Sequence, residues 1–259
     1  MRYSGSDDSQ AGKGSEKIAS LFYQKKEFNV YASYQAASDR YLPKLGFFPE
    51  IDYKGPQFSA SYQKTIVKGP IQGYNIGSDY TNYQHFDGGF YRRDWDLNGY
   101  LTFRHGPAFS YLLDLPNFEG QKDRFQSAGV TYPNDNPYRQ VSAGADWGTQ
   151  AELPYHTYKV GGKYRLMGKL DLGLTYQALF YQGYSDQIIG TLNYDMGHDR
   201  AISGRVVKQN DKLNPYIAFR RSGNAGMEYY LVVGDPNALQ FRSSIILKVT
   251  YPIERVLKG

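Results

Sequence analysis

The sequence contains no cysteine and no long hydrophobic run. Without cysteine, thiolate metal sites and cysteine nucleophiles are excluded. Mean hydropathy is −0.61, and the apolar runs are short, such as Ile245-Ile246-Leu247. A membrane helix needs about 18 or more consecutive apolar residues. A helical membrane protein is therefore excluded.

Recognisable catalytic motifs are also missing. The histidines are far apart and form no HExxH pair: His85, His105, His156 and His198. Neither Ser110 nor Ser203 lies in a nucleophile elbow. The chain is therefore predicted to be no enzyme and to need no cofactor. One enzyme reading stays open, because a barrel-embedded lipid hydrolase could assemble a Ser–His pair across strands.

Aromatic residues and glycine are abundant, with 26 Tyr, 14 Phe, 2 Trp and 28 Gly. Disordered chains are poor in aromatics, so this composition argues against disorder. It suits a barrel with aromatic girdles that crosses an oxidising compartment, and also a soluble β-protein. The net charge of +5 comes from 30 basic residues interleaved with 25 acidic ones. We therefore predict no nucleic-acid partner, and interpret pairs such as Arg92-Arg93 as strand-end or lumen charges.

Apolar and polar residues alternate over long segments. In 169–182 the even positions are mainly Leu, Tyr and Phe, whereas most odd positions are polar or small. The pattern recurs in 94–104, 155–166 and 239–251. An outer-membrane strand places every second side chain in lipid and needs about 9–11 residues to cross. Strands of soluble proteins have a mode of about 5–6 residues. The pattern thus predicts an all-β fold, a transmembrane antiparallel β-barrel in the bacterial outer membrane.

The pattern gives about 14 strands, with 12–16 compatible. The predicted strands are 16–24, 27–36, 57–66, 70–82, 88–104, 107–115, 139–149, 155–167, 169–182, 186–196, 200–209, 212–220, 226–233 and 239–251. The barrel would span 16–253, after a disordered segment at 1–15. That segment is polar and lacks a signal-peptide core, so the signal has been removed or the chain is the C-terminal part of a longer protein. We favour the second.

One consequence of this strand count is unfavourable. Barrels keep short turns on the periplasmic side and long loops outside. With fourteen strands and periplasmic termini, the two longest connections, 37–56 and 116–138, would be periplasmic. Either the count is off by one, a strand lies within 116–138, or strands before residue 1 are missing.

Charged residues on the polar side of the alternation are the candidate lumen residues. They are Arg92, Asp94, Asp96, Lys159, Lys163, Arg165, Asp171, Arg205, Arg220, Arg242 and Lys248. Most are basic, which predicts a mild anion preference for an open lumen. The dense segment 91–96 could instead be a sugar-stacking constriction, but we favour an interfacial strand end with paired charges.

Residues 39–53 read Asp-Arg-Tyr-Leu-Pro-Lys-Leu-Gly-Phe-Phe-Pro-Glu-Ile-Asp-Tyr. This segment resembles a signature of an uncharacterised bacterial outer-membrane β-barrel family. The residues that match that signature are Pro43, Gly46, Phe47, Asp52 and Tyr53. The family's Asn and Arg are replaced by Leu42 and Glu50 here, so any function of those two residues is lost. From the residues alone, the segment is a packed loop or an inward-folded plug, with Gly46 permitting a sharp turn.

The C-terminal part also resembles this family, in Leu213-Asn214, Phe219-Arg220-Arg221, 228–233 and 247–251. The resemblance covers about residues 15–253. It implies an outer-membrane barrel that in the family usually follows a family-nine-type carbohydrate-binding module, which is absent here.

These patterns together predict a pore, or the membrane anchor of a glycan-handling surface protein. The expected partners are outer-membrane lipid, small solutes or glycans, and other surface proteins. The alternatives are the barrel-embedded lipid hydrolase and a soluble lipocalin-like binder. A soluble binder would have its apolar face inside, so it would fold without detergent.

Overall fold

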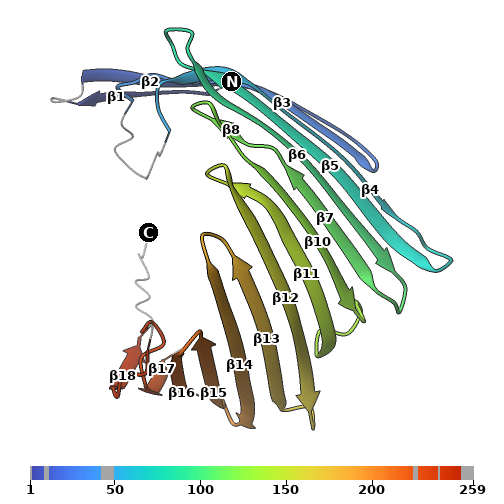
Figure 1. Ribbon diagram of the computed structural model, residues 1–259, viewed down its shortest axis with the longest axis vertical. Helices are drawn as coiled ribbons and strands as arrows, with labels where there is room; N and C mark the ends of the chain where they lie inside the picture. Colours follow the sequence, from blue (N-terminus) through green and yellow to red (C-terminus); the bar gives the residue numbers. More distant parts are fainter. Residues whose placement is uncertain (1, 9–11, 42–49, 224–226, 239, 252–259) are drawn as a thin grey trace, which may run out of the picture. The chain divides into compact units, whose positions relative to one another are not determined.

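The computed structural model describes residues 2–8, 12–41, 50–223, 227–238 and 240–251. Within these residues the fold is all-β, with antiparallel pairing and no helix (Figure 1). None of the described segments forms a helix with the length and apolarity needed to cross a membrane. The all-β antiparallel fold class expected from the alternation is confirmed.

The chain forms two compact units. The first unit is Met1–Val130 with Ala145–His156, and the second is Thr131–Gly144 with Thr157–Gly259. The strands before the boundary region are β1 (Arg2–Asp8), β2 (Gly12–Lys25), β3 (Phe28–Ala37), β4 (Tyr53–Thr65), β5 (Ile71–Gln84), β6 (Phe90–Phe103), β7 (Ala108–Asp114), β8 (Asn117–Phe118) and β9 (Gln121–Lys122). Three strands contribute residues to both units: β10 (Arg124–Tyr132), β11 (Arg139–Gln150) and β12 (Leu153–Leu166). The second unit continues with β13 (Leu170–Phe180), β14 (Tyr184–Gly197), β15 (Arg200–Gln209), β16 (Lys212–Ser222), β17 (Glu228–Val233) and β18 (Ile245–Thr250).

The structure adds strands that the sequence reading missed. Residues 1–15 were predicted to be disordered, but Arg2–Asp8 form β1, paired antiparallel with the start of β2. A further strand, β10, lies within the predicted long connection 116–138. Neither strand has a regular alternation of large apolar and polar residues. β1 is almost entirely polar, and β10 carries small residues at its centre. The first is defined by backbone pairing rather than by an apolar face, so periodicity could not find it.

With these strands included, the long connections fall on alternate positions along the chain. One set is short throughout: 26–27, 66–70, 104–107, 133–138, 167–169, 198–199 and 223–227. The intervening set contains the longest ones: 38–52, 85–89, 115–123, 151–152, 181–183, 210–211 and 234–244. Successive hairpins of an antiparallel sheet turn at opposite ends. β1 moves the 38–52 connection to the other end of the sheet, and β10 divides the connection predicted at 116–138. Together the two added strands remove the difficulty posed by the fourteen-strand count.

The last predicted strand, 239–251, is too long at its start. In the structure β18 begins at Ile245, so Arg242 lies in the 234–244 connection and not in a strand. Buried Asn214 in β16 holds this connection, because its Nδ2 donates to the carbonyls of Asp235 (3.0 Å) and Ala238 (2.6 Å). The Phe241 amide also donates to the Leu213 carbonyl of β16 at 2.9 Å. The alternation continues past the true strand start, so it carries no sign of these tertiary contacts.

Cross-strand register separates each unit into an apolar and a polar face. In the second unit, successive partners form apolar rows, which define its apolar face: Leu172–Leu192–Gly204–Ile217–Val233–Ile245 and Leu170–Tyr194–Ile202–Phe219–Leu231–Leu247. In the first unit the apolar face includes Phe58–Tyr80–Trp95 and Phe28–Tyr62–Ile76–Gly99–Tyr111. The polar faces are the opposite sides, made by the intervening residues. This is the arrangement that the alternation predicted.

The apolar faces are exposed rather than covered. In the second unit Leu174 is 61% exposed, Ile217 50% and Leu247 71%. In the first unit Ile76 is 54% exposed and Trp95 42%. Among the described residues, the buried hydrophobic side chains are few and mostly tyrosines on the polar side of the first unit. Neither unit therefore has the apolar core of a soluble domain.

Candidate functional site

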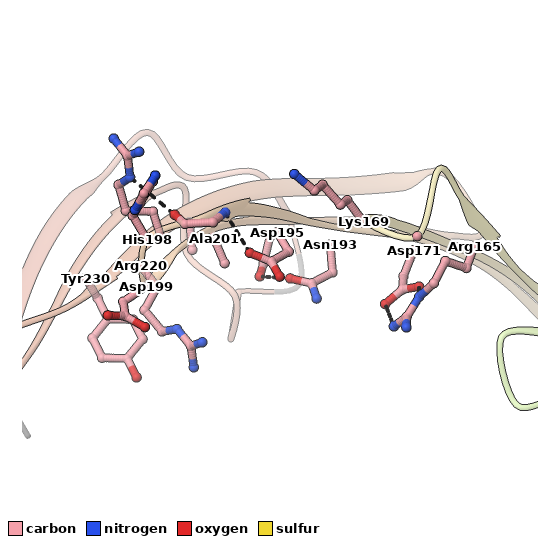
Figure 2. Close-up of a pocket in the computed structure, with 15 residues that line it drawn as sticks. Arg165, Lys169, Asp171, Asn193, Asp195, His198, Asp199, Ala201, Arg220 and Tyr230 are labelled. Atoms are coloured by element: carbon pink, nitrogen blue, oxygen red, sulfur yellow. Dashed lines mark hydrogen bonds and ion pairs between the residues drawn. The ribbon is translucent and has the colours of Figure 1, made fainter.

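The polar face of the second unit has a hollow of about 680 Å³. The hollow lies at the end of the strands where the uniformly short connections are, which we call the short-connection end; the opposite end is the long-connection end. Its charged and polar side chains come from β12 to β17 and from the turns at 167–169 and 198–199 (Figure 2). Of the predicted lumen residues, the structure brings Arg165, Asp171 and Arg220 together here. The sequence reading missed Asp195, Asp199 and Arg200, which lie at or beside turns.

Arg165 and Asp171 form a two-point ion pair across the hairpin between β12 and β13. The guanidinium Nε lies 2.5 Å from Asp171 Oδ1, and one terminal nitrogen lies 2.6 Å from Oδ2. The guanidinium carbon also lies 3.5 Å from the centre of the Tyr138 ring. Paired geometry and stacking together fix this guanidinium, so Arg165 is a positioned group rather than a mobile charge.

Other predicted lumen residues occupy the same face at separate positions. Arg205 pairs in register with Tyr216, and Arg220 with Tyr230. Lys248 follows in the next strand and lies 5.8 Å from the Tyr230 ring centre. Lys159 and Lys163 are exposed on β12. The described polar face of the second unit is therefore rich in cations.

The polar face of the first unit has the opposite character. Asp79, Asp96 and Asp114 are successive cross-strand partners on β5, β6 and β7. Asp94 is buried on the same side of β6, two residues from Asp96. The sequence reading included Asp94 and Asp96 but missed Asp79 and Asp114. Only strand register could reveal that these carboxylates form one row.

Arg92 joins this acidic face to the connection 38–52. Its guanidinium donates to Asp94 within β6 and to Glu50 Oε1 at 2.8 Å. A cluster of buried residues lies around the described ends of this connection: Ala37, Tyr41, Tyr53, Tyr83 and Tyr91. Of its signature, Asp52 and Tyr53 lie here, whereas Pro43, Gly46 and Phe47 lie outside the described residues.

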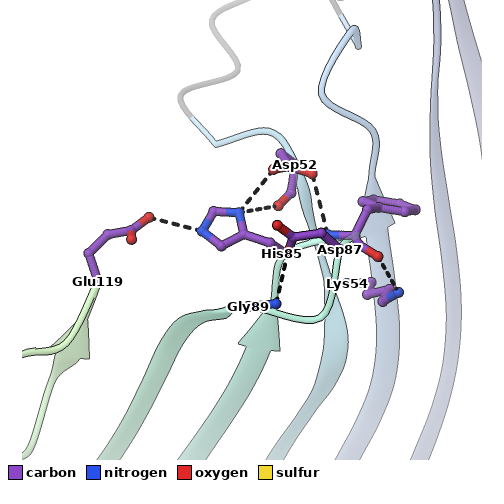
Figure 3. Close-up of polar contacts among 7 residues, drawn as sticks. Asp52, Lys54, His85, Asp87, Gly89 and Glu119 are labelled. Carbon is purple, nitrogen blue, oxygen red and sulfur yellow. Dashed lines mark hydrogen bonds and ion pairs between the residues drawn. The ribbon is translucent and has the colours of Figure 1, made fainter.

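His85 links three segments at the long-connection end of the first unit (Figure 3). Its Nδ1 lies 3.0 Å from both the carbonyl oxygen and Oδ2 of Asp52, and its Nε2 lies 3.1 Å from Glu119 Oε1. Both ring nitrogens therefore face acceptors, an arrangement that only the doubly protonated imidazolium satisfies. Burial opposes protonation, but the hydrogen bonds to Asp52 and Glu119 raise the pKa of His85.

This geometry predicts that His85 titrates above 6.5, its ordinary pKa. Because the folded-state pKa is raised, the stabilisation is fully present below the unfolded pKa and is lost as pH rises through the folded one. An NMR titration of the imidazole C–H signal, assigned by its loss in His85→Gln, should give a midpoint above 6.5. In Glu119→Gln the midpoint should fall towards the ordinary value. A midpoint at or below 6.5 would contradict the contacts of His85 with Asp52 and Glu119 as described.

The hollow in Figure 2 also contains a serine and a histidine, Ser203 and His198. Ser203 Oγ donates to Asn193 Oδ1 at 3.0 Å rather than to a histidine. A serine nucleophile requires a base within hydrogen-bond reach. The observed contacts around Ser203 therefore do not form the pair that the hydrolase alternative needs.

Comparison with known proteins adds no family. No protein-family model matches the chain, and no curated protein matches it.

Proposed function

We propose that this chain is an outer-membrane β-barrel protein that forms a narrow, water-filled pore. The observation that carries the proposal is the register that aligns apolar side chains into continuous, exposed rows. Water-exposed rows of leucine, isoleucine and phenylalanine are unfavourable, at about 25 cal/mol per Å² of apolar surface. Lipid acyl chains would remove that cost, as they do for the outer face of a membrane barrel.

The aromatic residues of the apolar face support the same assignment. Near the 181–183 connection, Tyr158, Phe180 and Tyr184 lie in a chain of ring contacts of 6.2 and 5.0 Å. Tyr194 lies near the other end of the same face, as the partner of Leu170. From Leu170 to Phe180 the strand rises about 33 Å, which at the usual tilt corresponds to an apolar band about 25 Å tall. Aromatic residues at both edges of such a band are typical of membrane barrels.

The polar faces and the connections support a pore with a constriction. The polar faces carry fixed charges that water can solvate, and the 38–52 connection is tied to the polar face through Glu50 and Arg92. The set that contains the long connections would face outside and the uniformly short set the periplasm. Membership of the outer-membrane barrel family that the sequence resembles is part of this proposal. A role as a membrane anchor is the alternative to a pore for the same barrel.

Refolding tests the membrane assignment directly. In detergent micelles the purified chain should give a β-sheet circular dichroism signal and heat-modifiable gel migration, and in plain buffer it should not. A monodisperse β-protein in buffer alone would favour the lipocalin-like binder. Turnover of lipid esters by the refolded chain would favour the hydrolase.

Ion selectivity tests the pore. The acidic row of the first unit offsets the basic excess on which the predicted anion preference depended, so we expect weak selectivity overall. Arg220→Gln should shift the permeability ratio towards cations by about twofold, because it removes one cation from a screened aqueous path. Arg221→Gln is the matched control, since Arg221 pairs with Tyr229 on the apolar face. Planar-bilayer reversal potentials give both values, and equal shifts would place Arg220 outside the conducting path.

A further inference from the structure

The neighbouring residues Arg92 and Arg93 of β6 lie on opposite faces. Arg92 faces the polar side, where its guanidinium forms ion pairs with Glu50 and Asp94. Arg93 faces the apolar side, as the partner of Asn82, and donates to Asn82 Oδ1 at 3.4 Å. Its guanidinium lies 5.9 Å from the Phe90 ring centre. Among the described residues, no carboxylate forms an ion pair with Arg93.

A second cation, Lys54, lies in the same region of the apolar face. Lys54 and Arg93 both line a hollow of about 290 Å³, together with Tyr34, Asn82 and Phe90. Lys54 Nζ donates to the Phe86 carbonyl at 3.0 Å and lies 5.2 Å from that ring centre. It too has no carboxylate partner among the described residues. The carboxylate in the adjacent turn, Asp87, instead accepts from the Gly89 amide.

Both cations lie beyond a row of aromatic residues, on the side nearer the 85–89 turn. Phe58, Tyr80 and Trp95 are successive cross-strand partners on the apolar face. Arg93 lies two residues beyond Trp95 towards the 85–89 turn, and Lys54 four residues beyond Phe58 in the same direction. Two residues of strand span about 7 Å. Aromatic belts sit at the level of lipid headgroups, so the two cations lie where headgroup phosphates would be.

We infer that Lys54 and Arg93 form a binding site for the phosphate group of a membrane lipid, with Asn82 as an additional polar group and the neighbouring rings contacting the lipid. This inference rests on the proposed membrane function. An anionic headgroup would supply the counter-charge that the described residues do not, and cations beside an anionic lipid surface each contribute appreciably to attraction.

Trp95 provides a local reporter for the test. In a Trp147→Phe background Trp95 is the remaining tryptophan, and it is exposed on the same face, with Nε1 donating to Ser78. The protein would be reconstituted into phosphatidylcholine vesicles containing phosphatidylglycerol, with bromine on the acyl chains of one lipid at a time. Quenching then gives the relative binding constant of the two lipids beside Trp95.

The Trp147→Phe parent should prefer phosphatidylglycerol, and the double variant K54Q/R93Q should lower this preference by about fivefold for each cation removed. The control K64Q/K68Q makes the same charge change at the opposite end of the β4–β5 hairpin and should keep the parent's preference. If the glutamine variant fails to refold, K54R/R93K should still retain the preference, because both charges remain.

Different outcomes overturn different claims. Equal quenching by both lipids in the Trp147→Phe parent, or an unchanged preference in K54Q/R93Q, would overturn the lipid-phosphate site alone. Loss of the preference on adding inorganic phosphate to the buffer would mean that the site takes free phosphate. No quenching by either brominated lipid would overturn the membrane assignment itself.

Discussion

Replacing Leu174 by arginine should destabilise the folded protein in lipid by about 2–4 kcal/mol, the cost of a cation near the bilayer midplane of a barrel. Leu174 lies near the middle of β13, is 61% exposed, and faces the same side as Leu172 and Tyr176. In a bilayer, an arginine at this position would contact acyl chains. Its cross-strand partner is Gly190, which has no side chain to bind the guanidinium. Urea titration in reconstituted vesicles, followed by tryptophan fluorescence, measures the difference.

The matched control for this substitution is Gln177→Arg. Gln177 lies on the polar face of the same strand, in register with Gln187. In a water-filled pore this arginine would be solvated, so its effect should stay within about 0.5 kcal/mol, as for surface substitutions. A sheet with this apolar face in water would give a different result, because Leu174 would then tolerate arginine. A neutral Leu174→Arg would therefore contradict the membrane assignment.

Replacing Gly148 by alanine should lower the free energy of unfolding by about 3 kcal/mol or more, or prevent refolding, since overpacking and backbone strain add. A Cβ atom at Gly148 would lie 1.6 Å from the Arg124 carbonyl oxygen, and the residue has a φ of +150°. A hydrogen bond from the Arg124 amide to Thr149 Oγ1, at 3.0 Å, holds the backbones of β10 and β11 close together beside Gly148. The β10–β11 contact would have to open. The refolded fraction on heat-modifiable gels and urea titration report this loss.

Gly190→Ala is the control for the loss of a glycine in a strand. A Cβ atom at Gly190 would have no atom within 4 Å and requires no unusual backbone. Alanine should therefore be neutral or stabilise the protein by up to about 1 kcal/mol, because it restricts the unfolded chain. If Gly148→Ala behaves like Gly190→Ala, then β10 does not approach β11 as described.

The sequence predicted most of the strands but not the contacts between distant segments. Period-two alternation is local, so it located β13 to within two residues at either end and identified its apolar side. It could not find β1 or β10, whose residues carry no such pattern, and it extended β18 past the turn that Asn214 holds. Strand ends set by a side chain elsewhere in the chain have no local signal.

The candidate sites divide in the same way. The alternation by itself determined that Arg165, Asp171 and Arg220 share a polar face, because side chains two residues apart point the same way. Only the tertiary structure decided the partners of the other charged groups: Glu50 for Arg92, Asp52 and Glu119 for His85, and Asn82 for Arg93. These contacts join residues more than ten positions apart, and register and loop packing bring them together. A charge on a strand is thus predictable from its sequence, whereas the group that neutralises it is not.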